Sequence, residues 1–354
     1  MSGIGSDLLV VIGIAVMFLA LIAPHEGGHF LVAKLCGVRI IEFSVGAGTR
    51  LWSTTRNGTL YAIRLIPIIG YVRMGGMEAG DFEEPNGFHS RAPWQRIAIL
   101  LAGPVANFLV AIVLITGFGL SQLNSDPGKV AGVFNPSAAA TAGIRPGDHI
   151  KTVNGKLITA PENIQQQEMA AAGEPVTITG THADGTQFTV VVTPVWQNGG
   201  WKIGVLIARV TTPLTALQDG VTFPLQATRV IVQGLSALVT GQVPGGLFGK
   251  EGLTGPIGIA AITSDAVNQG PTTYIWLVAL LSVALGVTNL LPLLALDGGR
   301  IVVVIIEWLR RRPFDRNSEL NFQRLGLVAL IALAAVISFL DIQRIATGQF
   351  LGVH

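Results

Sequence analysis

The sequence predicts a membrane protein with four transmembrane α-helices, a membrane-embedded β-hairpin, and a soluble β-rich domain inserted between the second and third helices. Half of the 354 residues are hydrophobic and only 12% are charged, about half the charged share of an average soluble domain. Apolar stretches beginning at Leu8, Ile97, Tyr274 and Leu325 indicate the spans that cross the lipid bilayer. The net charge of +2 gives no strong field that would favour nucleic acid as a partner.

The first span, Leu8–Leu35, could be mistaken for a signal peptide. It has no basic residue before it and no small-residue cleavage site after it, so we expect a retained helix. The third span is interrupted by Asn289, Pro292 and a glycine pair, which predicts a broken helix. The expected segments are a first helix at 1–36, a hairpin region at 37–94, a second helix at 95–120, an inserted domain at 121–211, an amphipathic region at 212–272, a broken third span at 273–312, and a loop with the fourth helix at 313–354.

The stretches Val38–Trp52 and Leu60–Met74 alternate between apolar and polar residues and are rich in β-branched residues and glycine. This pattern is typical of strands separated by turns. The stretch is too apolar for an aqueous loop, and non-helical backbone at membrane depth must be shielded by protein or water. We therefore expect a β-hairpin that enters the membrane beside the helices.

The inserted domain shows strand-like pieces at 129–134, 149–153, 176–181, 187–193 and 201–207, with a helix at Pro161–Ala172. Its segment Asn135–Gly155 resembles the signature of PDZ domains, which bind an extended peptide by adding it to a sheet edge. A small β-domain that serves only as a spacer is the alternative. Downstream, Val221–Thr240 is either an amphipathic helix on the membrane surface or part of an irregular linker.

The strongest chemical signal is the run His25-Glu26-Gly27-Gly28-His29 inside the first span. Residues at i and i+4 share one face of a helix, so both imidazoles can reach one zinc ion, and the adjacent glutamate can act as general base. Ionisable residues within a membrane helix are costly and usually functional. The alternatives are a chance match to the motif, and two histidines that pair with each other in a purely structural role.

A zinc site with one open position needs a third protein ligand. The acids in the remaining apolar spans are Asp297, Glu307 and Asp341. Gly298 and Gly299 break the helix beside Asp297 and allow close approach, so we predict that Asp297 completes the site. Glu307 is expected in a surface ion pair with the nearby arginines, and Asp341 at the outer membrane interface.

Lysine and arginine concentrate in the loops after the first span and after the third span. The positive-inside rule then places both loops in the cytoplasm. We therefore expect a multi-pass protein of the inner (cytoplasmic) membrane, with both termini and the inserted domain on the extracytoplasmic side.

The ordered set of motifs resembles the site-2 protease family of intramembrane zinc metalloproteases, in the bacterial branch of regulators of sigma-E proteases. The motifs span nearly the whole chain and are His25–Phe30, Phe43–Gly46, Gly70–Gly76, Leu101–Phe108, Gly255–Gly258, Asn289–Pro292 and Leu296–Arg300. The chain departs from the family's usual pattern at Gly27, Ile69 and Leu294, and at none of the expected ligands.

The resemblance implies that His25, His29 and Asp297 hold Zn²⁺ and that Glu26 activates water. It implies that the strand of Gly70, Tyr71, Val72, Arg73 and Met74 pairs with an unwound substrate helix, and that Asn289 holds the substrate or polarises its carbonyl. Asn107 has either a similar role or a hydrogen bond between helices. The implied substrates are single-span membrane proteins such as anti-sigma factors, or remnant signal peptides. A membrane transporter and a membrane-anchored PDZ scaffold are the alternative functions.

Overall fold

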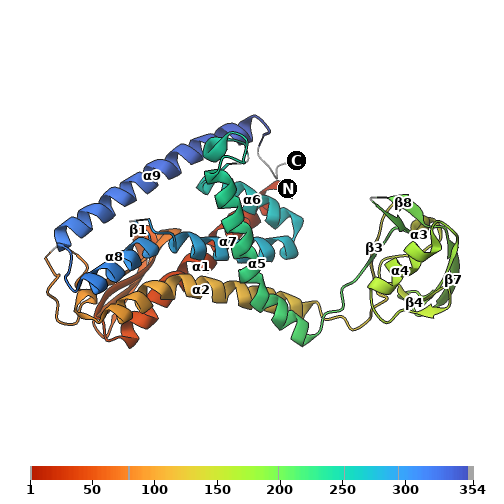
Figure 1. The fold of residues 1–354 in the computed structure, drawn as a ribbon, viewed down its shortest axis with the longest axis horizontal. Coiled ribbons are helices and arrows are strands. Elements are labelled where there is room, and N and C mark those ends of the chain that lie inside the picture. Colours follow the sequence, from red (N-terminus) through yellow and green to blue (C-terminus); the bar gives the residue numbers. More distant parts are fainter. Residues whose placement is uncertain (1, 79, 198, 251, 294, 350–354) are drawn as a thin grey trace. The chain divides into compact units, whose positions relative to one another are not determined.

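The structure is a computed structural model that describes residues 2–349 apart from 79, 198, 251 and 294 (Figure 1). The chain divides into two compact units, one of Met1–Thr116 with Asp219–His354 and the other of Gly117–Gln218. The expected departure at Leu294 falls outside the described residues.

The first unit is mainly helical. Within the described residues, four helical stretches are long and apolar enough to cross a membrane, and they confirm the four predicted spans: Asp7–Leu35, Pro93–Ser121, Pro271–Asn289 and Arg316–Ala346. They belong to α1 (Ser2–Leu35), α2 (Pro93–Ser121), α7 (Pro271–Asn289) and α9 (Arg316–Ala346). Three further helices are α5 (Pro213–Val239), α6 (Pro256–Gln269) and α8 (Asp297–Arg310).

The third apolar stretch of the sequence contains the end of one helix and the start of another. Helix α7 ends at Asn289, and α8 begins at Asp297. A Cβ atom on Gly298 would lie 2.3 Å from the carbonyl oxygen of Leu290 and 2.4 Å from that of Leu291. Only glycine permits this approach, so Gly298 lets the first turn of α8 fold back against the end of α7.

The region between α1 and α2 forms the antiparallel strands β1 (Ile40–Arg56) and β2 (Thr59–Met74). β1 bends where Gly46 and Gly48 adopt φ angles of +96° and +80°. Its first half, 42–45, pairs with 60–63 on one side and with 70–73 on the other, while 50–56 pairs with 59–64. The hairpin is therefore a small sheet of strand segments in the order 50–56, 59–64, 40–45 and 70–74, with 70–74 at one edge.

Glu307 lies deep in the structure rather than on the surface, which corrects the expected surface ion pair. It is 4% exposed; its carboxylate accepts hydrogen bonds from Arg96 at 2.8 Å and Arg316 at 2.7 Å, and from the backbone N–H of Phe314 at 2.9 Å. Arg96 comes from α2, more than 200 residues away in the chain, and this separation hides the partner from a reading of neighbouring residues. The two ion pairs of Glu307 on α8, with Arg96 and Arg316, connect this helix to α2 and to the start of α9.

Asp341, which the sequence places near the outer end of the last span, is fully buried within the protein. Its Oδ2 accepts hydrogen bonds from the backbone N–H groups of Gly255 at 2.8 Å and Gly258 at 2.9 Å, at the N-terminus of α6. A carboxylate in this position satisfies free amide groups and stabilises the helix dipole. Arg344 pairs with Asp341 and donates to the carbonyl oxygen of Leu253, which holds α9 against this loop.

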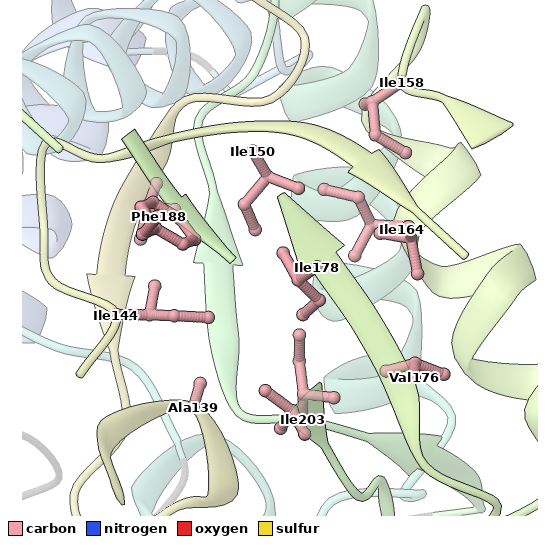
Figure 2. Close-up of a cluster of buried hydrophobic side chains, with 12 residues drawn as sticks. Ala139, Ile144, Ile150, Ile158, Ile164, Val176, Ile178, Phe188 and Ile203 are labelled. Atoms are coloured by element: carbon pink, nitrogen blue, oxygen red, sulfur yellow. The ribbon is translucent and has the colours of Figure 1, made fainter. Parts of the chain in front are cut away.

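The second unit has a four-stranded antiparallel sheet in the order β5-β4-β6-β7 and a second pairing of β3 with β10. Its core is built from alternating strand residues such as Ile150, Val176 and Ile178, packed against Ile164 of a helix (Figure 2). The elements are β3 (Val130–Val133), α3 (Ala138–Thr141), β4 (His149–Val153), β5 (Lys156–Leu157), α4 (Glu162–Ala171), β6 (Val176–Thr181), β7 (Gln187–Val192), β8 (Val195–Gln197), β9 (Gly200–Lys202) and β10 (Val205–Ile207).

Two details of this unit differ from the sequence prediction. The expected strand 201–207 is split into β9 and β10, because Gly204 adopts a φ of +91° between them. The short helix α3 was not expected; Ser137 caps it by accepting a hydrogen bond from the N–H of Ala140. The unit begins and ends side by side, since Asn124 and Thr211 exchange backbone hydrogen bonds of 3.0 and 2.8 Å.

Candidate active site

His25 and His29 lie one turn apart on α1, and their imidazoles point to the same place. Their Nε2 atoms are 3.2 Å apart, and the Oδ2 atom of Asp297 lies 3.3 Å from each of them. Both histidines are buried, at 7% and 6% exposure. The structure therefore brings Asp297 next to two histidines that lie more than 260 residues earlier in the chain.

The spacing of these three atoms fits a zinc ion. Zinc binds histidine nitrogen and carboxylate oxygen at about 2.0–2.2 Å in a tetrahedron, which separates neighbouring ligand atoms by roughly 3.3–3.5 Å. Asp297 Oδ2 is buried and accepts no well-formed hydrogen bond among the described residues. A buried carboxylate oxygen without a donor, facing two imidazole nitrogens, is suited to a cation. These three residues could hold the metal and leave a fourth position open.

His25, His29 and Asp297 line a cavity with a volume of 490 Å³. Glu26, which follows His25 on α1, lines the same cavity. The cavity wall includes Gly70, Tyr71, Val72 and Met74 of the edge segment 70–74, as well as Asn289. A Cβ atom on Gly70 would lie 2.8 Å from Cγ of Glu26. The edge of the small sheet therefore runs directly past the glutamate.

Arg73 and Asn107, two of the expected substrate-binding residues, have side chains with partners inside the protein. The side chain of Arg73 is not among those that line the cavity, and its guanidinium forms an ion pair of 2.7 Å with Glu78. Asn107 is fully buried on α2, and its amide nitrogen lies 3.3 Å from Nδ1 of His25. Asn107 on α2 therefore contacts a candidate ligand on α1, in agreement with the second of its two expected roles, a hydrogen bond between helices.

Asn289 lies at the last turn of α7, on the cavity wall. Its amide nitrogen donates a 3.0 Å hydrogen bond to the carbonyl oxygen of Leu285. This hydrogen bond orders the amide at the C-terminal end of α7, where the chain leaves α7 before α8 begins at Asp297.

Two glycines make room for the histidines. A Cβ atom on Gly103 of α2 would lie 2.2 Å from Nε2 of His29 and 2.8 Å from Cε1 of His25. A Cβ atom on Gly28 would lie 2.3 Å from the carbonyl oxygen of Ala102, so α1 and α2 touch backbone to backbone. At Gly27, by contrast, a Cβ atom would meet nothing within 4 Å, so this departure from the family pattern does not disturb the packing.

A partly buried network of hydrogen bonds among Glu42, Arg64 and Tyr71 holds the edge segment 70–74 in place. The hydroxyl of Tyr71 donates to Glu42 at 2.7 Å, and Arg64 donates to Glu42 at 2.7 Å and to the Tyr71 hydroxyl at 2.8 Å. Burial alone would raise the pKa of Glu42, but the hydrogen bonds from Arg64 and Tyr71 outweigh it and lower this pKa below its usual value. The anionic carboxylate therefore holds Tyr71 in place at the cavity wall.

Helix α9 also contributes to the cavity, which was not expected from the sequence. Leu320, Gln323, Arg324 and Leu327 line it, together with Arg300 of α8, and the Arg300 guanidinium donates to the side-chain oxygen of Gln323 at 2.9 Å. The spacing of three and four residues, which puts these side chains on one face of a helix, is the signal that could have indicated them.

Two buried histidines and an aspartate around one point, a glutamate beside them and four membrane-crossing helices define a metallopeptidase of the membrane. A model of peptidase family M50 matches residues 13–333. The chain therefore belongs to peptidase family M50, the site-2 protease family of zinc metalloproteases.

Relatives over nearly the full length carry related names. The zinc metalloprotease RasP of Geobacillus kaustophilus is 30% identical, and the match covers 94% of this chain and 98% of the relative. The regulator of sigma-W protease RasP of Bacillus subtilis is 28% identical over 95% of this chain and 98% of its own. The metalloprotease MmpA of Caulobacter vibrioides is 29% identical, with 98% of both chains covered.

Proposed function

We propose that this protein is an intramembrane zinc metalloprotease that cuts peptide bonds in the transmembrane segments of single-span substrates. The observation that carries the proposal is the triangle of His25, His29 and Asp297, with edges of 3.2–3.3 Å that fit three ligands of one zinc ion. Glu26 is the general base. The function of a transporter or a scaffold does not require three such ligands beside a cavity that is also lined by a glutamate.

When bound, zinc lowers the pKa of water toward neutrality and polarises the peptide carbonyl. Glu26 accepts the proton of the attacking water and later passes it to the leaving amine. Asn289 positions the substrate carbonyl from the cavity wall, where its amide is already ordered by Leu285.

A transmembrane substrate must unwind before it is cut, since the carbonyl groups of a helix are hydrogen-bonded at i→i+4. Unpaired backbone groups cost several kcal/mol each in a membrane interior. Within the described residues, the segment 70–74 pairs with another strand on one side only, and it borders the cavity. An extended substrate that adds to this edge satisfies its free backbone groups next to Glu26.

The substrate class that we propose is a single-span anti-sigma factor or a remnant signal peptide. A relative in Bacillus subtilis is named a regulator of sigma-W protease, which supports the first of these. We further propose that the unit Gly117–Gln218 is a PDZ domain, extracytoplasmic like both termini, which either binds a peptide or restricts access by bulky substrates. The positive loops favour this orientation in the inner membrane.

The test is the substitution Glu26→Gln in purified protein reconstituted with a single-span substrate. We expect cleavage to fall by at least 100-fold while one zinc ion per chain is retained, because the amide keeps the shape of the side chain but cannot accept the proton. The matched control is Glu162→Gln, an exposed glutamate on α4 that should leave cleavage unchanged. Turnover by Glu26→Gln at the wild-type rate would remove this residue from the mechanism.

A further inference from the structure

The Nδ1 atoms of the two candidate histidine ligands have different hydrogen-bond partners. His29 donates from Nδ1 to the backbone carbonyl oxygen of Ile99 at 2.7 Å. A carbonyl oxygen can only accept, so the proton must sit on Nδ1 and the lone pair of Nε2 faces Asp297. This tautomer is the one that binds a metal through Nε2.

His25 has no such fixed acceptor among the described residues. Its Nδ1 lies 3.3 Å from the side-chain amide of Asn107, which is fully buried on α2. An amide can present either end to the ring. With the nitrogen forward it donates to Nδ1, which leaves the proton of His25 on Nε2, directed at Asp297. With the oxygen forward it accepts from Nδ1–H, and Nε2 is then free to bind a metal.

The nitrogen-forward state leaves the oxygen of the Asn107 amide unpaired. The Oδ1 atom of Asn107 is buried and has no hydrogen-bond partner among the described residues. A half-turn of the amide supplies the missing donor from His25. The half-turn moves only the side chain of Asn107. The backbone carbonyl oxygen of Asn107 keeps its 2.9 Å hydrogen bond from the hydroxyl of Ser282 on α7.

We infer that Asn107 is a positioning residue that selects the metal-binding tautomer of His25 by accepting a hydrogen bond from Nδ1. The inference rests on the proposed function, since it assumes that His25 binds zinc through Nε2. It concerns an acceptor behind the ligand rather than contact with substrate. Partners of this kind contribute about 10–100-fold to metal affinity in other zinc sites.

The test measures the dissociation constant for zinc of the full chain in detergent, by competition with a chelator. In Asn107→Leu the acceptor is lost, and we expect zinc affinity to fall 10–100-fold. In Asn107→Asp an acceptor is kept, and we expect affinity within about threefold of the wild type or tighter. Ser282→Ala is the matched control, because it removes the hydrogen bond to the Asn107 backbone and leaves the side chain in place.

The outcomes separate the inference from the proposed function. If His25→Ala binds zinc as tightly as the wild type, the proposed site itself is wrong. If His25→Ala loses zinc but Asn107→Leu keeps wild-type affinity, only the role of Asn107 is overturned. Should Asn107→Leu fail to fold, Asn107→Asp decides alone, since a tenfold loss of affinity there contradicts the acceptor role.

Discussion

Replacing Gly103 with alanine adds a single methyl group where the two histidine rings meet α2. The new Cβ atom would lie 2.2 Å from Nε2 and 2.6 Å from Cε1 of His29, whereas ordinary contacts begin at 3.4 Å. The ring of His29 or the backbone of α2 must therefore yield by about 1 Å in an interior that is closely packed. A backbone shift is opposed by the contact of Gly28 with Ala102.

The expected loss follows from the tolerance of a metal site. Ligand distances in zinc sites vary by only about 0.2 Å, so a displacement of about 1 Å removes His29 from the coordination sphere. A misplacement of that size costs about 100-fold in catalysis even when all groups are present. We expect Gly103→Ala to lose at least 100-fold in zinc affinity and in the rate of substrate cleavage.

The assay is chelator competition for zinc, together with cleavage of a single-span substrate in detergent. Gly117→Ala on the same helix is the control, because its Cβ atom would meet nothing within 4 Å. Both substitutions favour the helix by up to about 1 kcal/mol through backbone entropy, so a difference between them reports packing alone. Wild-type zinc affinity in Gly103→Ala would refute the arrangement of α1 against α2 described above.

Three further predictions concern other parts of the first unit. Gly70→Ala should lower the cleavage rate while zinc affinity is unchanged, because its Cβ atom would displace Glu26 at 2.8 Å; equal loss of zinc would contradict this reading. Glu307→Leu leaves Arg96 buried without its partner and should cost about 3–5 kcal/mol of stability, measured by chemical unfolding and compared with the exposed Arg312→Leu. Burial, followed by the nearby charges of Arg316 and Arg96, lowers the pKa of His89 to about 3, well below its ordinary value of 6.5. The unfolded chain therefore binds the proton first, and stability that is complete above pH 6.5 falls toward pH 3, by up to about 1.4 kcal/mol per pH unit. His89→Gln should flatten this dependence in thermal unfolding, and an identical pH profile would show that His89 is not its source.

The sequence was sufficient to predict the features that depend on local pattern. Long apolar stretches predict the four spans, and the glycine pair after Asp297 predicts the break in the third. The spacing of His25 and His29 follows from the helix repeat alone. The strands of the second unit follow from alternation, which is strong where one face is buried, as at 176–181.

The features that could not be predicted depend on contacts between distant segments. One of the two arginine partners of Glu307, Arg96, lies 211 positions away, and the amide groups that Asp341 satisfies lie more than 80 positions away. The double pairing of 42–45 was equally hidden, because a pattern of alternation indicates a strand without indicating how many neighbours it has. The role of Asn107 stayed open between two alternatives, because a motif gives a residue's identity but not the direction of its side chain.

Because Asn124 and Thr211 are joined by backbone hydrogen bonds, the chain enters and leaves the inserted unit at neighbouring points. A segment of this kind can be exchanged for another of any length, provided that the ends of the replacement also meet. The sequence of the insertion can therefore change without altering the helices of the first unit, which keep their own sequence constraints. Chimaeras joined at these two residues would put that independence to use.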